Sequence, residues 1–557
     1  MTTRKISSTI AALIACLSLP LAAAELNFTR QAFTLPVAIE NLLVADTNAD
    51  GLNDLIAVLD DVMRVYFQNA EGFDFDAGYA EIPMPGKAIG WDLSTNYSDD
   101  GSASIIALVD GTEVMAWHVR EREIQPPEVI ISGLGGFLGR GINRLHFSRD
   151  VNNDGRDDLI VPGAGELQLH LRNADGSYQS PLPVKSDVQL RNNLDQDRLE
   201  RNTGQAITIP AMELRDVNAD GHADIVSRTE DRLDVFFANS SGAAYFPTAP
   251  TYSIDVAAIA AGLGEFDIDS LDFSNLTGVL ALTHEEILED VDGDGIEDLL
   301  LREGGKVSLF GGNSTGLDQE QPRQVLRSGG NVLSTFLYDE NEDGLKDLWL
   351  WRVESVSVGD IFVWLALSGS IAVEAFIYPN EGERFARRPT RQITVDLKFP
   401  SAIRLASSYR EIRNDLEGAE NAAVIPTSVT TMDENPDKLE LLVLLDQQLQ
   451  IFLNSITPEP EDPEFLGALG YTRQRNNYEI DIREIIENIQ LNANPELAQV
   501  KDKTADQIID LAIDKTTGDI IPVRLNNDAI DDVFLFTDFD SSLIHGLLLL
   551  SNDTRAQ

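Results

Sequence analysis

The sequence predicts an all-β protein, a β-propeller made of four-stranded blades set around a ring. Three observations support this fold class. A nine-residue acidic loop recurs five times, each copy runs into a short apolar segment, and turn signals divide the rest into further short strands. One unit occupies about 50 residues, a length typical of propeller blades.

The recurring loop has oxygen-bearing side chains at positions 1, 3, 5 and 9 and glycine at position 6, as in the copy from Asp46 to Asp54. Side chains on alternate residues of a curling loop can converge on one point, and glycine permits a positive-φ turn. Such oxygen donors suit Ca²⁺, with a backbone carbonyl at position 7 as a further ligand. The predicted side-chain ligands are Asp46, Asn48, Asp50, Asp54, Asp150, Asn152, Asp154, Asp158, Asp216, Asn218, Asp220, Asp224, Asp290, Asp292, Asp294, Asp298, Asp339, Asn341, Asp343 and Asp347.

An EF-hand is the nearest alternative for these loops. That motif needs glutamate at position 12 and a helix on each side. Position 12 here is occupied by residues such as Ala57 and Leu301, and the loops run into short branched-chain segments such as Leu55–Val58. These segments are typical of buried strands. We therefore expect each loop to join two strands.

The remainder of each unit supplies two more strands. In the first unit, the alternating segment Val62–Phe67 predicts a third strand. A turn from Asn69 to Gly72 follows, and Phe73–Ile82 is predicted as the fourth strand. Similar Asn and Gly turns follow the third strand of several other units.

Three weaker copies of the loop raise the number of units to eight. The copy from Asn96 has Ser104 at position 9, and the copy from Asp433 has Lys438 at position 6 and Leu441 at position 9. The copy around Asn526 has Arg524 where the first aspartate belongs. We interpret these as blades with a degraded or absent metal site. Seven blades, with the second or seventh unit discounted, is the alternative.

The loop, the strand after it and the Asn-Gly turn together resemble the FG-GAP or VCBS repeat of integrin-α-like β-propellers. The resemblance covers most of residues 26–557, and five copies match the metal motif at every ligand position. It implies a propeller with about five structural Ca²⁺ ions, each held in the loop between the first two strands of a blade. It does not imply one biochemical activity.

The two ends of the chain predict how the ring closes. The last unit ends after its third strand, Ile544–Leu550, which leaves its blade one strand short. The segment Phe28–Pro36 resembles the fourth-strand stretch of the first unit. Pairing of this N-terminal strand with the last blade would remove two exposed sheet edges.

Residues 1–24 are predicted to be a signal peptide, because a basic start precedes an apolar stretch and Ala22–Ala24 forms a cleavage site. The protein is therefore expected to be exported to the periplasm, the cell surface or the medium. A lipobox ending at Cys16 is the alternative, which would anchor the protein through a lipid. Cys16 is the only cysteine, so the mature chain has no disulfide.

Residues 25–557 are predicted to form one propeller domain with three insertions. They fall at about 188–206, 353–373 and 455–520. In the second insertion, Ile361–Val373 is expected to be a short helix that covers the propeller and runs into the strand Ala375–Tyr378; its apolar stretch is too short to span a membrane. In the third insertion, helices are expected near 482–491 and 505–513. Such loops on a rigid scaffold can carry binding groups.

The chain is strongly acidic, with a net charge of −50. Five Ca²⁺ ions would neutralise only about ten of these charges. Most of the acidity therefore faces solvent, which disfavours nucleic acid and anionic lipid as partners.

The sequence contains no recognisable catalytic motif such as GxSxG or HExxH. The six histidines, His118, His146, His170, His222, His284 and His545, have no spacing typical of metal ligands or a triad. We therefore predict a binding or adhesion module that presents a loop face to a protein or glycan. The alternative is an extracellular polysaccharide-cleaving, lyase-like enzyme, which a funnel lined by His, Tyr, Arg or Lys at the insertion-bearing face would favour. The sequence does not indicate the ligand or the oligomeric state.

Overall fold

The computed structural model describes residues 26–36, 42–59, 61–98, 101–194, 203–209, 212–240, 244–267, 271–401, 404, 425–432, 438–445, 447–458, 464–482, 494–511, 519–526, 528–539 and 543–552. The expected signal peptide and Cys16 lie outside these residues. Strands form most of the secondary structure, and no described helix is long and apolar enough to cross a membrane. The expectation of an all-β chain is confirmed.

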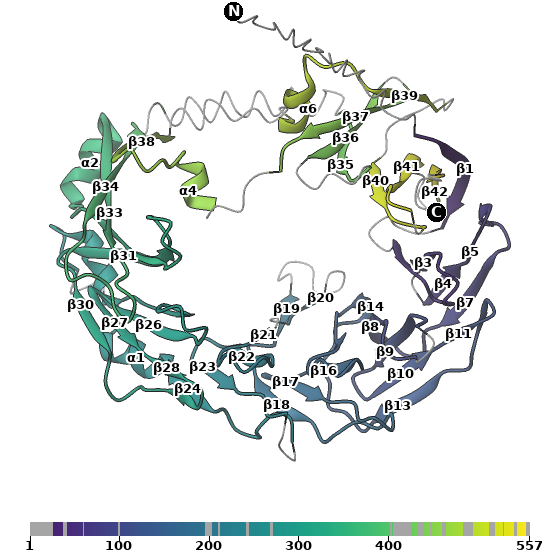
Figure 1. The fold of residues 1–557 in the computed structure, drawn as a ribbon, viewed down its shortest axis with the longest axis horizontal. Helices are drawn as coiled ribbons and strands as arrows, with labels where there is room; N and C mark the ends of the chain where they lie inside the picture. Colours follow the sequence, from purple (N-terminus) through teal and green to yellow (C-terminus); the bar gives the residue numbers. More distant parts are fainter. Residues whose placement is uncertain are drawn as a thin grey trace, which may run out of the picture.

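Eight sheets of four or five strands make up most of the described structure, and they succeed one another in chain order round an arc (Figure 1). Sheet 1 contains β2 (Leu42–Ala45), β3 (Asp54–Val58), β4 (Val62–Tyr66) and β7 (Tyr79–Pro83). Sheet 2 contains β8 (Ala88–Ser94), β9 (Ser104–Val109), β10 (Glu113–Trp117), β13 (Glu128–Ser132) and β14 (Gly141–Arg144). Sheet 3 contains β15 (Ser148–Arg149), β16 (Asp158–Gly163), β17 (Glu166–His170) and β18 (Leu182–Lys185). Sheet 4 contains β21 (Glu213–Arg215), β22 (Asp224–Arg228), β23 (Arg232–Phe236) and β24 (Tyr252–Asp255).

The second half of the chain repeats this arrangement. Sheet 5 contains β25 (His284–Glu289), β26 (Asp298–Glu303), β27 (Lys306–Phe310) and β30 (Gln324–Arg327). Sheet 6 contains β31 (Asn331–Tyr338), β32 (Asp347–Val353), β33 (Ser368–Tyr378), β34 (Arg391–Pro400) and β38 (Asn477–Asp481). Sheet 7 contains β35 (Thr427–Thr430), β36 (Leu439–Leu445), β37 (Gln448–Ile456) and β39 (Gln507–Asp510). Sheet 8 contains β40 (Ile520–Val523), β41 (Asp532–Phe539), β42 (Ile544–Ser551) and β1 (Phe28–Leu35).

Each sheet is an antiparallel meander, to which sheets 2 and 6 add one parallel strand, β14 beside β8 and β38 beside β34. The first strand of a sheet lies nearer the centre of the arc and the fourth at its periphery, as β8 and β13 show (Figure 1). The second strand is the most buried, and all five residues of Asp54–Val58 are buried. The expected short buried strand after each complete loop is therefore confirmed.

The apolar core lies between the faces of successive sheets. Ile56 and Val65 of sheet 1 pack in one cluster with Trp91 and Ile105 of sheet 2. Equivalent clusters join sheets 2 and 3, 3 and 4, 4 and 5, 5 and 6, and 7 and 8. Sheets 1 to 5 and sheet 8 thus bury both faces against neighbouring sheets, which explains why their strands are rich in branched apolar residues. The other face of sheet 6 packs against Leu466, and that of sheet 7 packs against Val500.

The two ends of the chain meet in sheet 8, as the sequence predicts. Strand β1 pairs antiparallel with β42 over its whole length, from Phe28 opposite Ser551 to Leu35 opposite Ile544. Phe33 is buried and contacts Phe75, Phe534 and Phe536 at ring-centroid distances of 5.5–5.6 Å. The same cluster includes Leu55 of sheet 1, so the N-terminal strand also joins the first and last sheets.

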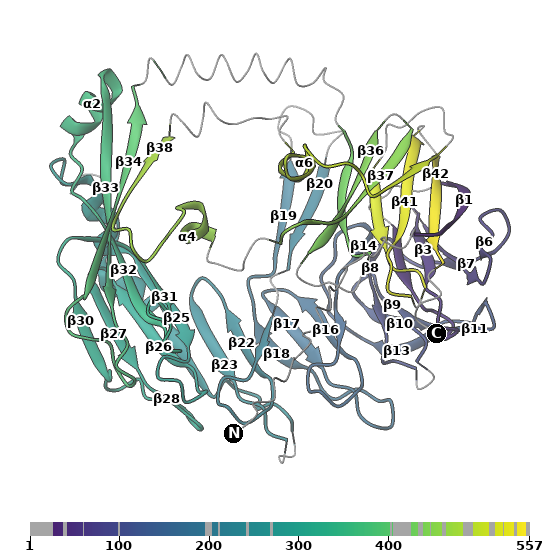
Figure 2. The ribbon, with the colours of Figure 1, turned by 45° about the horizontal axis from the view of Figure 1, so that its top comes forward.

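Four small hairpins lie outside the eight sheets. They are β5 (Gln68–Asn69) with β6 (Gly72–Phe73), β11 (Val119–Arg120) with β12 (Glu123–Ile124), β28 (Gly312–Asn313) with β29 (Gly316–Leu317), and β19 (Gln189–Leu194) with β20 (Thr203–Thr208). The first and third contain the predicted Asn and Gly turns. The fourth lies in the insertion expected at 188–206 and stands clear of the sheets on either side (Figure 2).

The first hairpin corrects the predicted fourth strand of unit one. Phe73 pairs back onto Gln68, and the fourth strand begins at Tyr79. Between them, the Asp74 carboxylate accepts hydrogen bonds from the backbone N–H groups of Asp76 and Ala77 at 3.1 and 3.0 Å. This turn interrupts the strand predicted for Phe73–Ile82.

The insertion in sheet 6 also differs from the prediction. Helix α2 (Val358–Ala366) is capped by Ser357, whose hydroxyl accepts a hydrogen bond from the Asp360 backbone N–H at 3.1 Å. Residues 368–373 belong to β33 instead, because they pair along β34. The helix lies against β33 and β34, where Trp364 stacks on Phe399. None of the α2 residues is buried, and Phe362 is 68% exposed, so the helix covers the sheet less closely than expected.

Sequence reasoning was wrong about part of the third insertion. The helix predicted at 505–513 is the strand β39, whose residues pair with β37 in sheet 7. The backbone N–H of Leu26 donates to the Gln507 side-chain oxygen at 2.8 Å, and the Gln507 side-chain nitrogen donates to the Leu26 carbonyl at 2.7 Å. These two bonds hold β39 beside the segment that precedes β1. The helix predicted near 482–491 falls almost entirely outside the described residues. The remaining helical segments are α1 (Val256–Leu263), η3 (Leu276–Leu282), α4 (Glu464–Ala468) and α6 (Pro495–Val500).

Replacing Phe33 by alanine should lower the free energy of unfolding by about 3–4 kcal/mol, because it removes a buried aromatic ring from the cluster that joins the chain ends. Chemical denaturation followed by tryptophan fluorescence measures the change. Phe266→Ala is the matched control, since Phe266 is 61% exposed. Equal denaturation midpoints for the two variants would show that β1 does not help to stabilise the sheet arrangement.

Candidate metal-binding loops

All five complete acidic loops connect the first strand of a sheet to the second. They lie between β2 and β3, β15 and β16, β21 and β22, β25 and β26, and β31 and β32. Strands flank every one of them, so the EF-hand alternative is excluded by the local fold. The glycine at position 6 has φ between 81° and 90° in the five loops, which confirms the positive-φ turn predicted there.

One hydrogen-bond network is repeated in these loops. In the sheet 3 copy, Asp150 at position 1 accepts hydrogen bonds from the backbone N–H groups of Asp154 and Gly155 at 3.1 and 2.8 Å. The carboxylate of Asp154 accepts from the backbone N–H of Arg156 at 3.0 Å. These bonds curl the chain around its own acidic side chains. Position 4 also has positive φ, including the non-glycine residues Ala49, Asn153, Ala219 and Glu342, which the sequence did not indicate.

The aspartate at position 9 has a different environment from the other three ligands predicted for each loop. Asp54, Asp158, Asp224, Asp298 and Asp347 are all no more than 2% exposed. In sheet 4, the two oxygens of Asp224 accept from the backbone N–H of Val217 at 2.9 Å and from that of Ala238 at 2.7 Å. Val217 is at position 2 of the loop, and Ala238 follows the third strand. One buried carboxylate therefore ties the loop to the opposite end of the hairpin, a role that sequence reasoning missed.

Burial changes the acidity of these closing carboxylates. Desolvation raises the pKa of Asp54, Asp224 and Asp298 to about 6 and that of Asp158 to about 7, and it also raises the pKa of Asp347. The backbone hydrogen bonds act in the opposite direction and offset only part of this effect. A divalent cation close by would favour the ionised form.

Among the described residues, one loop brings three carboxylates close enough together to share a metal ion. In the sheet 5 loop, Asp290, Asp292 and Asp294 place one carboxylate oxygen each within 4.8 Å of one another. Oxygen ligands at about 2.3–2.6 Å from a common Ca²⁺ lie up to about 5 Å apart, so the three oxygens can share one ion. Asp298 at position 9 does not belong to this group. Its carboxylate instead pairs with Arg323, whose guanidinium also contacts Asp292 at 2.6 Å.

The three weaker loops lack the full set of predicted metal ligands. A polar side chain at position 9 or next to it still makes hydrogen bonds that hold the loop to the rest of its sheet. In sheet 2, Ser104 lies at position 9, and its hydroxyl contacts the His118 imidazole Nδ1 at 2.9 Å. In sheet 7, Asp433–Asp437 lies outside the described residues, but Glu440 accepts from the backbone N–H groups of Met432 and Asn454 at 2.7 and 3.2 Å. Glu440, not Leu441, therefore occupies the closing position.

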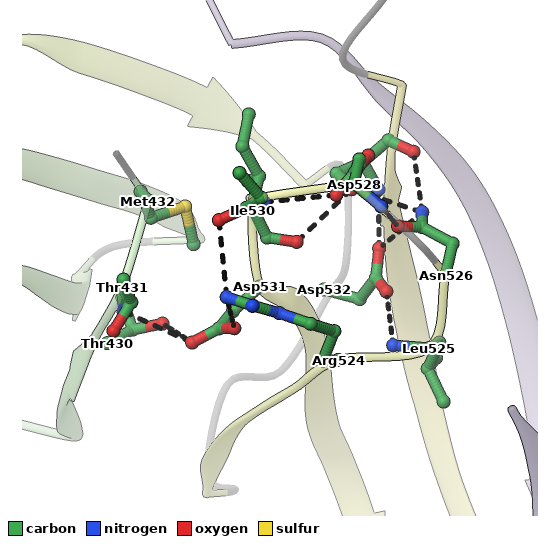
Figure 3. Close-up of polar contacts among 12 residues, drawn as sticks. Thr430, Thr431, Met432, Arg524, Leu525, Asn526, Asp528, Ile530, Asp531 and Asp532 are labelled. Atoms are coloured by element: carbon green, nitrogen blue, oxygen red, sulfur yellow. Dashed lines mark hydrogen bonds and ion pairs between the residues drawn. The ribbon is translucent and has the colours of Figure 1, made fainter. Parts of the chain in front are cut away.

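Figure 3 shows the loop of sheet 8. Here direct hydrogen bonds link residues at the positions that are predicted to be metal ligands in the complete loops. Arg524 replaces the first aspartate and contacts Asp531 at 3.1 Å. Asp528 accepts a hydrogen bond from the Ser551 hydroxyl at 2.7 Å. The closing carboxylate of Asp532 accepts from the backbone N–H groups of Leu525 and Ser551 at 2.8 and 2.7 Å. This loop is thus held by its own side chains, in agreement with its interpretation as a degraded site.

The loops also connect neighbouring sheets through position 8. The backbone N–H of Asn53 in sheet 1 donates to the carbonyl of Leu525 in sheet 8 at 2.8 Å. Ala103, Glu297 and Asp531 make equivalent bonds to the preceding loops at 2.9–3.1 Å. The side chain of this position often adds a second contact; the Glu297 carboxylate accepts from Arg215 of sheet 4 at 2.7 Å. Each such loop therefore joins its own sheet to the one before it.

Three of the histidines contact a nearby polar side chain. His284 contacts Glu286 at 2.6 Å and His545 contacts Thr34 at 2.9 Å, while His118 is bound to Ser104. His146 lies instead in a pocket of about 510 Å³ with Arg144, Arg149 and the Ile209 backbone region that follows β20. Sequence spacing gave no signal for this grouping, because the lining residues come from four separate segments, within 92–93, 144–149, 160–167 and 209–212.

Comparisons with known proteins do not assign the chain to a family. No protein-family model and no curated protein matches it. An Agrocybe aegerita lectin that recognises non-reducing terminal N-acetylglucosamine is 15% identical, with 65% of this chain and 80% of the lectin covered and a TM-score of 0.24. BBS1N, solved in complex with ARL6DN, is 9% identical, with 94% and 97% covered and a TM-score of 0.20. A Photorhabdus luminescens Tc holotoxin pore is 11% identical, with 80% and 21% covered and a TM-score of 0.20. Likenesses this weak assign neither fold nor function.

Replacing Asp532 by asparagine should lower the free energy of unfolding by about 2–3 kcal/mol, because the amide cannot accept from both backbone N–H groups and turns a donor toward one of them. Asp532 is fully buried and belongs to a loop without the metal pattern, so the change isolates the closing interaction. Denaturant unfolding in excess chelator measures it. Asp76→Asn, at an exposed turn, is the control, and equal stability of the two variants would contradict the role assigned to the closing carboxylate.

Proposed function

We propose that the chain is an exported, calcium-binding β-propeller of the FG-GAP or VCBS type that binds a protein or glycan ligand. One observation carries this proposal: the same acidic loop geometry recurs between the first and second strands of five sheets. The succession of eight sheets and the pairing of β1 with β42 support an eight-bladed ring over the seven-bladed alternative.

Calcium has a structural role in this proposal. The loop carboxylates lie close together and carry several negative charges, so their mutual repulsion opposes folding until a cation offsets it. The same loops connect neighbouring blades through position 8, so an ion held in one loop stabilises the contact between two blades. The mature chain is expected to have no disulfide. In this proposal, the bound ions and the buried core are therefore what stabilise the fold.

Titration with Ca²⁺ should show uptake of about five ions and a large rise in melting temperature relative to excess EGTA. At ten times Kd, one site adds about 1.4 kcal/mol of stability by mass action, so five independent sites add about 7 kcal/mol. Calorimetry and thermal unfolding measure the two effects. Asp154→Ala should remove about one ion, whereas Asp175→Ala, at an exposed turn of the same sheet, should remove none. An unchanged melting temperature in EGTA would contradict structural calcium.

A polysaccharide-cleaving, lyase-like enzyme is a second candidate, because one pocket is lined by a histidine and two arginines, of which Arg144 is paired with Asp92 of the same pocket. Arg144, His146 and Arg149 line this pocket near the base of the β19–β20 hairpin. In an elimination reaction on an acidic sugar, arginines would offset the negative charge and an imidazole would accept the proton. His146 also has a backbone φ of 51°, in the left-handed region.

A glycan array followed by a depolymerisation assay distinguishes the two functions. A binding module should retain particular glycans without changing their length, with and without Ca²⁺ in the buffer. New unsaturated ends, detected by absorbance at about 232 nm during incubation, would favour the enzyme. Loss of this signal in His146→Ala but not in His222→Ala would locate the reaction in the pocket of sheets 2 and 3.

A further inference from the structure

A second pocket, at the periphery of sheets 5 and 6, is unusually basic for this chain. It has a volume of about 540 Å³ and is lined by nine residues that include Arg323, Arg327, Arg384 and Arg387. None of the nine carries a carboxylate. On a chain with 92 acidic and 42 basic residues, four arginines with no acidic residue among the lining side chains form a local reversal of charge.

Three of these guanidiniums have no counter-charge in the described part of the chain. Arg323 is paired with Asp292 and Asp298 of the sheet 5 loop. Within the described residues, the side chains of Arg327, Arg384 and Arg387 form no hydrogen bond or ion pair. All three side chains are exposed, so water and salt screen their mutual repulsion, and an anion that entered the pocket would be attracted to each of them.

The backbone around the pocket is firmly anchored, so the arginines are not brought together by a loose loop. Phe385, which lies between the basic residues of the segment after β33, is 1% exposed and packs in the core between sheets 5 and 6. The Gln324 side chain donates to the Phe385 carbonyl at 2.7 Å and accepts from its N–H at 2.9 Å. Asn380 adds a hydrogen bond to the Val291 carbonyl at 2.6 Å. These contacts hold Arg384 and Arg387 over β30, which carries Arg327.

We propose that this pocket binds the carboxylate group of an acidic sugar. A guanidinium presents a planar pair of donors that matches a carboxylate in a bidentate geometry, which a lysine ammonium does not. Tyr378, half-buried at the pocket wall, supplies an aromatic surface beside the basic groups. The choice of a sugar as ligand rests on the proposed function; the anion site itself rests on the three arginines without an ion pair, Arg327, Arg384 and Arg387.

The charge of the whole molecule favours an isolated anionic group over a polyanion such as nucleic acid. A net charge of −50 repels a chain of closely spaced phosphates, whereas the pocket offers a small basic surface to a single anionic group. A sugar acid brings one carboxylate per residue together with neutral hydroxyls. Its carboxylate can therefore occupy the pocket while the neutral part of the sugar lies outside it.

Isothermal titration with trigalacturonic acid, in Ca²⁺ and separately in EGTA, tests the proposal. We expect binding in both buffers, weaker binding as the salt concentration rises, and no binding of the fully methyl-esterified trisaccharide. Arg384→Ala combined with Arg387→Ala should raise Kd at least tenfold, because it removes two charge-assisted contacts. Arg388→Ala is the control; it removes one positive charge at the position next to Arg387, outside the pocket lining.

Several results would overturn the inference. Equal Kd values for the double variant and Arg388→Ala would place any binding elsewhere, and absence of binding by the wild-type protein would remove the site. Stronger binding of hexaglutamate peptide or of oligothymidylate would assign the pocket to a different ligand class. Melting temperatures of the variants check that they remain folded. If the protein takes up no Ca²⁺ but still binds the sugar acid, the result contradicts the proposed calcium sites and leaves the anion site supported.

Discussion

The fold depends on a buried acidic side chain at the start of the second strand in seven of the eight sheets. Its two oxygens accept backbone N–H groups from the loop on one side and from the end of the third strand on the other, as Asp224 does in sheet 4. Unmade hydrogen bonds at such buried backbone groups would cost about 1–3 kcal/mol each. The carboxylate thus holds three parts of the chain together at the point where each sheet is most buried.

The same interaction explains which features of the repeat vary and which do not. Predicted ligand positions 1, 3 and 5 are exposed or half-buried except for the buried Asn218, and the first of them is replaced by Arg524 in sheet 8. The closing position is kept as an acid even where the metal pattern is lost, by Asp532 and by Glu440, and in sheet 2 a Ser104–His118 contact takes its place. Structural closure of the hairpin is therefore separable from cation binding, although both use the same loop.

The repeated strands could be predicted from the sequence because their signal is local: an acidic loop, an apolar segment and a turn. The number of sheets and the pairing of the chain ends followed from counting these units. Glu440 was missed because the loop was counted forward from Asp433, whereas the register is set by the apolar strand that begins just after the acid. The strand β39 was taken for a helix because its partner in sheet 7 is distant in sequence. The basic pocket was also not predictable, since Arg327 and Arg384 are brought together by the core contact of Phe385.

The pairing of β1 with β42 has a consequence for the order of events during synthesis. The first strand emerges more than 500 residues before its partner, so it must wait, unpaired, until translation is almost complete. A contact of such long sequence separation forms slowly, and an edge left open in the meantime can pair with another chain. Premature termination anywhere before the last hairpin would leave that edge exposed for good. Sheet 8 therefore cannot be completed until the C-terminal hairpin has been synthesised.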